Sequence, residues 1–164
     1  MKFLLQSTLI IITLSFFTAC GEQAQQQIIH QAKAIESSDE CHLCGMLITN
    51  FSGPKGELYR KDRGDKVHKF CSTRDMFSFY LDPENKRNVT TMYVHDMSKM
   101  PWNEPDDGYF IDAKTAWFVV DSEKTGAMGK TLASFSKQSD ASAFALEFGG
   151  EVLDFSQVDQ ASLM

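Results

Sequence analysis

The chain has 164 residues, with 16 lysine and arginine residues against 22 aspartate and glutamate residues, and a formal net charge of −6. This acidic balance argues against nucleic acid as a partner, because binding to phosphates depends on clustered basic side chains. The length that remains after an N-terminal export segment is enough for one compact domain with its own core.

The N-terminus predicts an export signal. Lys2 precedes an apolar stretch from Phe3 to Phe17, and small residues then lead to Cys20. This pattern is typical of a secretory signal. Small residues directly before a cysteine also resemble a bacterial lipobox, in which residues 1–19 are removed and Cys20 is lipidated, although Phe17 stands where leucine is usual. The alternatives are an ordinary cleaved signal or an uncleaved anchor.

Residues 20–38 are rich in glutamine, alanine, glutamate and serine, and we expect them to form a flexible tether. No aspartate follows Cys20, which in lipoproteins indicates the outer membrane as the destination. No second stretch is long and apolar enough to span a bilayer. The folded domain is therefore expected at residues 39–164.

The first part of this domain predicts strands followed by a helix. Ser72 and Asp75 have the spacing of a capping box, and apolar residues follow at helical spacing until Pro83. Alternation and β-branched residues predict strands before and after this helix, at residues 46–50, 57–60, 66–70 and 90–95.

The second part repeats this order after a long loop at residues 97–116. The pattern predicts a helix capped at Ser139 and ended by Gly149, with strands at residues 117–120, 132–135 and 151–155. The parallel indicates a weak internal duplication. We therefore predict an α+β fold in which two related ββαβ units, at about residues 41–97 and 115–157, form one compact domain.

Once Cys20 is assigned to lipid, an odd number of cysteines remains: Cys41, Cys44 and Cys71. An exported free thiol indicates a metal site, a redox cycle or a partner. A thioredoxin-like pair needs a helix after its first cysteine, whereas a strand is expected here. Covalent haem needs a histidine after the second cysteine, and Gly45 stands there.

Two kinds of metal site and a plain disulfide stay open. Cys41, Cys44, Cys71 and His68 form a legitimate tetrahedral zinc set, although a structural role suits His68 better. Thiolate and thioether ligands instead select Cu(I). The thioether candidates are Met46, Met97 and Met100, together with Met128 in an accessible glycine-rich turn; His95 shares a strand face with Met97 if the strand continues. Methionine is otherwise a common core filler.

The chain resembles the NosL family of lipoprotein accessory factors for nitrous-oxide reductase maturation. The matching pieces run from about residue 36 to residue 155 and include "DECHLCGMLITNFSGPKGE", "KFCSTRDM", "YVHDM", "PDDGYFIDAKTAWFVV" and "GAMGKTLASF". No single piece is decisive, but their order and spacing together are specific to the family. The lipobox at Cys20 is part of the same resemblance.

The resemblance implies a Cu(I) metallochaperone rather than an enzyme, lipid-anchored at the periplasmic face of a membrane. It implies a role in assembling the copper–sulfide cluster of nitrous-oxide reductase. The implied partners are a maturation complex with a periplasmic β-helical protein and an ABC transporter. The implied fold has two ββαβ units and is similar in part to organomercurial lyase.

The resemblance also implies ligands of cysteine, methionine and histidine type. The Cys-x-x-Cys-Gly-Met pattern carries over to Cys41, Cys44 and Met46. A second expected cluster is His95, Met97 and Met128, and further candidates are Met100, Cys71 and His68. Two rival functions stay open. One is a thiol–disulfide reductase that uses Cys41 and Cys44, and the other is a lipoprotein interaction module with structural zinc.

Overall fold

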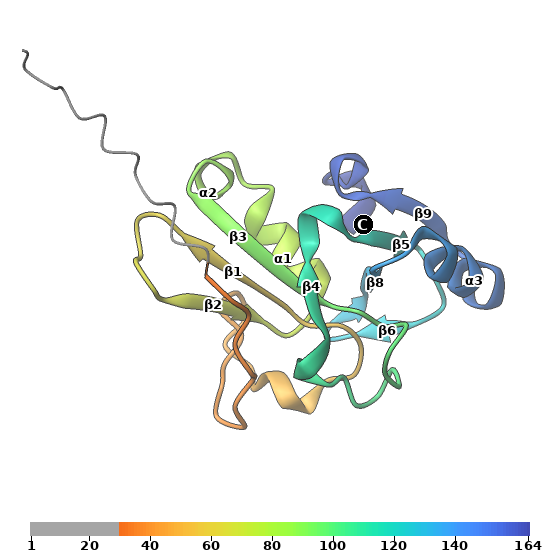
Figure 1. The fold of residues 1–164 in the computed structure, drawn as a ribbon, viewed down its shortest axis with the longest axis horizontal. Coiled ribbons are helices and arrows are strands. Elements are labelled where there is room, and N and C mark those ends of the chain that lie inside the picture. Colours follow the sequence, from red (N-terminus) through yellow and green to blue (C-terminus); the bar gives the residue numbers. More distant parts are fainter. Residues whose placement is uncertain (1–29) are drawn as a thin grey trace, which may run out of the picture.

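A four-stranded sheet from residues 56–112 and a three-stranded sheet from residues 117–154 form the fold (Figure 1). The computed structural model describes residues 30–164. The predicted signal, Cys20 and the start of the predicted tether lie outside the described residues. Within the described range, none of the helices has the length and apolar character needed to cross a bilayer.

The first sheet has the strand order β2-β1-β3-β4. Its strands are β1 (Gly56–Arg60), β2 (Val67–Phe70), β3 (Val89–His95) and β4 (Phe110–Asp112). The helices α1 (Thr73–Tyr80) and α2 (Pro83–Lys86) lie between β2 and β3 in the chain. The strands predicted around residues 57–60, 66–70 and 90–95 and the capped helix are therefore confirmed.

The second sheet has the order β8-β5-β9. It contains β5 (Trp117–Val120), β8 (Ala133–Phe135) and β9 (Glu151–Asp154), with α3 (Gln138–Phe148) before β9. A small hairpin, β6 (Thr125–Gly126) and β7 (Gly129–Lys130), follows β5. In both sheets the unit's first strand is central, and its second strand and the strand after the helix flank it in antiparallel pairing. This shared order confirms the predicted pair of ββαβ units.

Side chains on β1 alternate between the core and the opposite face of the sheet, as the pleat requires. Gly56 and Leu58 face the core, where a Cβ atom at Gly56 would lie 2.6 Å from the Met76 sulfur. Phe77 of α1 then meets Phe118 of β5 edge to face, with ring centroids 5.0 Å apart. Burial of a phenylalanine stabilises a fold by about 1.5–3 kcal/mol, so this contact joins the two units.

The opposite face of the first sheet is covered by residues 30–38, which we call the strap. The hydroxyl of Tyr59 donates to the Gln31 carbonyl at 2.8 Å, and the hydroxyl of Tyr93 donates to the His30 carbonyl. The His30 ring also stacks on Tyr59. The described end of the segment that we expected to be a tether is therefore held against the domain.

Three predictions of local structure are wrong. The expected strand at 46–50 is a single bridge at Leu47 followed by a 3₁₀ turn at Ile48–Asn50, because Ile48 turns inward and is buried. The helix α3 is capped at Lys137 rather than at Ser139. The predicted loop at 97–116 contains β4, which exists because it pairs with the distant strand β3.

Candidate metal centre

Cys41 and Cys44 lie in a tight loop that precedes the first sheet. The Cys41 N–H donates to the Met46 carbonyl and the Gly45 N–H donates to the Cys41 carbonyl, both at 2.8 Å. Gly45 has φ +73°, a conformation that glycine adopts at no steric cost. Backbone N–H groups of Leu43 and Cys44 point at the Cys41 sulfur, and the Met46 N–H points at the Cys44 sulfur. The sulfurs of Cys41 and Cys44 therefore lie on the same side of the loop, toward Cys71.

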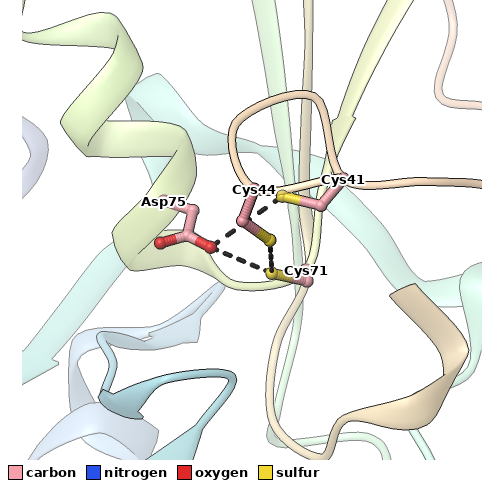
Figure 2. Close-up of side chains that lie close together, drawn as sticks. All are labelled: Cys41, Cys44, Cys71 and Asp75. Carbon is pink, nitrogen blue, oxygen red and sulfur yellow. Dashed lines mark hydrogen bonds between the residues drawn. The ribbon is translucent and has the colours of Figure 1, made fainter. Parts of the chain in front are cut away.

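Cys71 reaches the same place from the corner between β2 and α1. Phe70 ends β2, and Ser72 caps α1 by accepting from the Asp75 N–H at 3.0 Å. The loop of Cys41 and Cys44 is tied to this corner because the His42 N–H donates to the Lys69 carbonyl at 2.8 Å. The Cys44 and Cys71 sulfurs consequently lie 3.5 Å apart (Figure 2).

Asp75 completes the cluster from the first turn of α1. Its side chain turns back toward Cys71, which directly precedes the N-cap residue Ser72. The Cys71 thiol donates to Asp75 Oδ2 at 2.9 Å, and the Cys41 sulfur lies 3.9 Å from the same oxygen (Figure 2). The three sulfurs and one Asp75 oxygen all lie within 4.8 Å of one another. Among residues 30–164, no other group of three or more histidine, cysteine, aspartate or glutamate side chains meets in this way.

The environment gives the three thiols different acidities. Contact with Cys71, together with backbone N–H groups, lowers the pKa of Cys41 to about 4 despite burial. The contact with Cys41, burial and the neighbouring Asp75 raise the pKa of Cys71, and burial raises that of Cys44. At neutral pH the cluster therefore holds one thiolate among two thiols.

Such a cluster can hold a soft or borderline metal ion. Three sulfur ligands in trigonal arrangement suit Cu(I), and the same sulfurs with a carboxylate oxygen suit tetrahedral Zn²⁺. Cys41 and Cys71 are 2% and 0% exposed, whereas Cys44 is half-buried. An ion or an exchanging ligand would therefore reach the cluster at Cys44.

Two other predicted ligands lie beside this cluster. Met46 is half-buried and lies two residues after Cys44 in the same loop. His68 on β2 is 5% exposed and packs against His42, with ring centroids 4.2 Å apart. Burial lowers the pKa of His68 to about 4. Neither ring nitrogen of His68 has a hydrogen-bond partner in the described part of the chain.

His95 and Met97 do not share a strand face, so that expectation is wrong. The strand β3 ends at His95. His95 is fully buried, where its Nδ1 accepts from the Lys55 N–H at 3.2 Å and its Nε2 donates to Asp107 at 2.9 Å. Met97 packs instead with Phe135 in a second hydrophobic cluster.

The remaining two predicted methionine ligands, Met100 and Met128, have different surroundings. The Met100 sulfur accepts a hydrogen bond from the Asp106 N–H at 3.1 Å and packs at the edge of the second cluster. Met128 lies in the β6–β7 turn with φ +61° and is 65% exposed, as its glycine-rich surroundings predict.

Asp75 is a member of the cluster that local sequence patterns indicate only as the partner of the N-cap residue Ser72. Its contact with the three cysteines depends on the loop of Cys41 and Cys44, which is more than 30 positions away in the chain.

The chain is similar to known proteins along most of its length. The model of the NosL family matches residues 32–163. The chain is 48% identical to the copper-binding lipoprotein NosL of Stutzerimonas stutzeri over 157 residues, which are 95% of this chain and 81% of that protein. It is 30% identical to the copper-binding lipoprotein NosL of Achromobacter cycloclastes over 167 residues, which cover 100% and 85% of the two chains.

A solved structure shares the fold. The crystal structure of the copper chaperone NosL from Shewanella denitrificans superposes with a TM-score of 0.79 at 58% sequence identity. The match covers 81% of this chain and 98% of that chain. The α+β fold with two related units is therefore common to both proteins.

Proposed function

The chain belongs to the NosL family, and on that premise we propose that it is a Cu(I)-binding chaperone rather than an enzyme. The observation that carries the proposal is the meeting of three free cysteine sulfurs in one buried cluster. Thiolates select Cu(I) over harder ions. The relatives named above as copper-binding proteins or a copper chaperone support the same metal.

The proposed copper ligands are the sulfurs of Cys41, Cys44 and Cys71. Met46 is the candidate for a thioether that joins them at the exposed edge, because it follows Cys44 in the same loop. His95 is not included, because both of its ring nitrogens already have partners. The exposed thioether of Met128 is a candidate contact for a partner protein.

Release of copper follows from the accessibility of Cys44. A three-coordinate Cu(I) ion has room for an added ligand, so a partner's thiolate, thioether or imidazole can bind before a cysteine leaves. Cys44 is the half-buried member of the set, so the incoming ligand adds on its side. The ion keeps its oxidation state throughout this exchange.

The proposed location is the periplasmic face of a membrane, through lipid on Cys20, with the outer membrane as the destination. The names of the lipoprotein relatives support an anchor of this kind. The proposed recipient is the assembly machinery for the copper–sulfide cluster of nitrous-oxide reductase, with its periplasmic β-helical protein and ABC transporter. The family membership supports this recipient.

One observation favours a second candidate, a structural zinc site. The Asp75 carboxylate lies within hydrogen-bond distance of Cys71, and it supplies the fourth ligand that a tetrahedral zinc ion needs. A protein that depended on such a zinc ion for folding would unfold when the metal was removed.

Metal selectivity tests the proposal. The full-length protein, purified in reduced form without oxygen, is analysed for metal and then titrated with Cu(I) against a strong Cu(I) chelator. The copper proposal predicts one tightly held Cu(I) ion per chain and a folded metal-free protein. Stoichiometric zinc that Cu(I) does not displace, with unfolding after zinc removal, would establish the structural site instead.

A further inference from the structure

Four side chains on one face of the first sheet hold the strap by its backbone. Tyr59 and Tyr93 donate to strap carbonyls, and the Lys69 ammonium donates to a third. The Glu57 carboxyl accepts from the Lys33 N–H at 2.9 Å. Lys69 and Tyr93 are the cross-strand partners of Glu57. Tyr59 lies two residues after Glu57 on β1, so all four share a face of the sheet, and the strap lies directly over Glu57.

Glu57 is buried under the strap with half of its carboxyl group unpaired. The residue is fully buried, and its Oε2 atom has no hydrogen-bond partner among residues 30–164. An ionised carboxylate in such a place is much less stable than a neutral carboxyl group. Burial consequently raises the pKa of Glu57 to about 7. With the strap in place, Glu57 is therefore protonated below this pH.

Other charged and titratable groups face Glu57 from each neighbouring element. The ammonium groups of Lys33 on the strap and Lys69 on β2 favour the ionised carboxylate, whereas Asp107 opposes it. Lys69 also forms an ion pair with Asp39, which offsets part of its charge. The remaining titratable neighbours around the strap are Tyr59, Tyr93, Asp112 beside Tyr93, His30, and Asp65 beside His30. Burial outweighs these charges and is the largest cause of the raised pKa.

We propose that the strap is a pH-sensitive latch, which lifts from the sheet when Glu57 loses its proton and leaves the cysteine loop in place. With the strap lifted, Glu57 faces water and ionises with its ordinary pKa of 4.5. The closed state therefore keeps a proton that the open state releases. Rising pH favours the open state from 4.5 to about 7, and no further change follows above that value.

The strap can lift without the cysteines because the chain is fixed again at Asp39. The Asp39 carboxylate pairs with Lys69, and the Ile48 N–H donates to the Asp39 carbonyl at 3.0 Å. The cysteine loop is bonded separately to the Lys69 carbonyl through the His42 N–H. The Asp39 N–H donates to the Glu36 carbonyl at 2.9 Å, so the turn at residues 36–39 is the hinge of the latch.

Opening of the latch lengthens the link between the domain and the membrane. The strap comprises residues 30–38, and a segment of this length spans about 30 Å when it is extended. This consequence rests on the proposed lipid anchor at Cys20 and is separate from metal binding. The domain is held closer to its anchor at low pH and reaches farther from it at neutral pH and above.

Amide hydrogen exchange of the full-length, reduced and metal-free protein tests the latch. The amides of Lys33 and Ile35 are bonded to Glu57 and Asp107. After correction for the base-catalysed exchange of free peptides, both should exchange about 20-fold faster at pH 7.5 than at pH 5.5. They should also exchange faster than the amides of β1 and of His42 at either pH. In Glu57→Gln, the corrected strap rates should be equal at the two pH values.

Two control variants and a second measurement keep the test decisive. His30→Phe retains a ring that can stack on Tyr59, and Glu151→Gln changes an exposed glutamate of β9, so both should keep the pH dependence. If Glu57→Gln does not fold, the carboxyl ¹³C resonance of Glu57 in the native protein replaces it. Strap exchange should then level off where this carboxyl group is half ionised.

Two results would overturn the latch. One is a corrected exchange rate of the strap amides that stays constant with pH. The other is a strap that exchanges only as fast as β1, because the strap would then open only when the whole domain unfolds. Since the measured protein is metal-free, neither result bears on the copper proposal, and a failure to bind copper would leave the latch untouched.

Discussion

The sulfur atoms of Cys44 and Cys71 lie 3.5 Å apart, although 27 positions separate these residues in the chain. One belongs to the loop before the first sheet and the other to the corner where β2 passes into α1. The cluster therefore exists only when the first ββαβ unit is folded. A metal ion bound there would stabilise the folded state over the unfolded state.

The loop conformation at Gly45 is expected to control metal affinity. Gly45→Ala places a side chain at φ +73°, where space is open but the conformation itself costs about 1 kcal/mol. The loop will relax and move Cys44 away from Cys71, so Cu(I) affinity should fall by about tenfold or more. Chelator competition measures the change.

Gly64→Ala is the matched control for this change. Gly64 has φ +56° and also has open space around it, but it lies in the turn between β1 and β2. Both variants should lose similar stability in urea, while only Gly45→Ala should lose copper affinity. Equal copper affinities in the two variants would show that the loop conformation does not position the sulfurs.

Asp75→Asn is expected to make Cys71 more acidic. The contact with Cys41 is the largest cause that raises the pKa of Cys71, and burial and the Asp75 carboxylate add to it. Removal of that negative charge should lower the pKa, so the thiolate absorbance of the metal-free protein should appear at lower pH. Asp140→Asn, in the first turn of α3, is the control. A rise in the pKa of Cys71 would contradict the arrangement.

Glu57 is expected to make the protein less stable as pH rises. It is fully buried, and burial raises its pKa from 4.5 to about 7. The folded state therefore holds a proton that the unfolded state releases between these values, so stability falls as pH rises from 4.5 to 7, by about 3 kcal/mol at most. Glu57→Gln should remove this fall in urea unfolding. If the unfolding free energy changed equally with pH in the native protein and in Glu57→Gln, the prediction would be wrong.

The strap is expected to loosen when its tyrosine donors are removed. Tyr59→Phe with Tyr93→Phe deletes two hydrogen bonds to strap carbonyls, each worth about 0.5–1.5 kcal/mol. The amide protons of Lys33 and Ile35, which are bonded to Glu57 and Asp107, should then exchange faster. The exposed Tyr109 supplies the control Tyr109→Phe. Unchanged exchange would mean that other contacts hold the strap.

Local signals predicted most of the fold. The capping box at Ser72 and the apolar spacing after it located α1, and alternation located β1, β2 and β3. The strand predicted at residues 46–50 is wrong although the residues there favour β-structure. Ile48 is buried in the core, and only Leu47 forms a β-bridge. The strand β4 could not be predicted, because its pairing with β3 is a long-range contact.

The site was predictable only where its residues are close in sequence. The spacing of Cys41 and Cys44 indicates that the two thiols act together, whereas Cys71 could equally be a third thiol of the site or a small buried hydrophobic residue. The burial of His95 and its two partners, Lys55 and Asp107, depends on segments 40 and 12 residues away. No local pattern could have shown that its nitrogens are occupied.

The central claim is that Cys41, Cys44 and Cys71 together bind Cu(I). X-ray absorption on the reduced protein with one Cu(I) ion per chain counts the sulfur ligands directly. The account predicts at least three sulfurs in the native protein, one fewer in Cys71→Ser, and circular dichroism that is unchanged between them. A copper ion with nitrogen ligands, or one whose sulfur count does not change in Cys71→Ser, would contradict it.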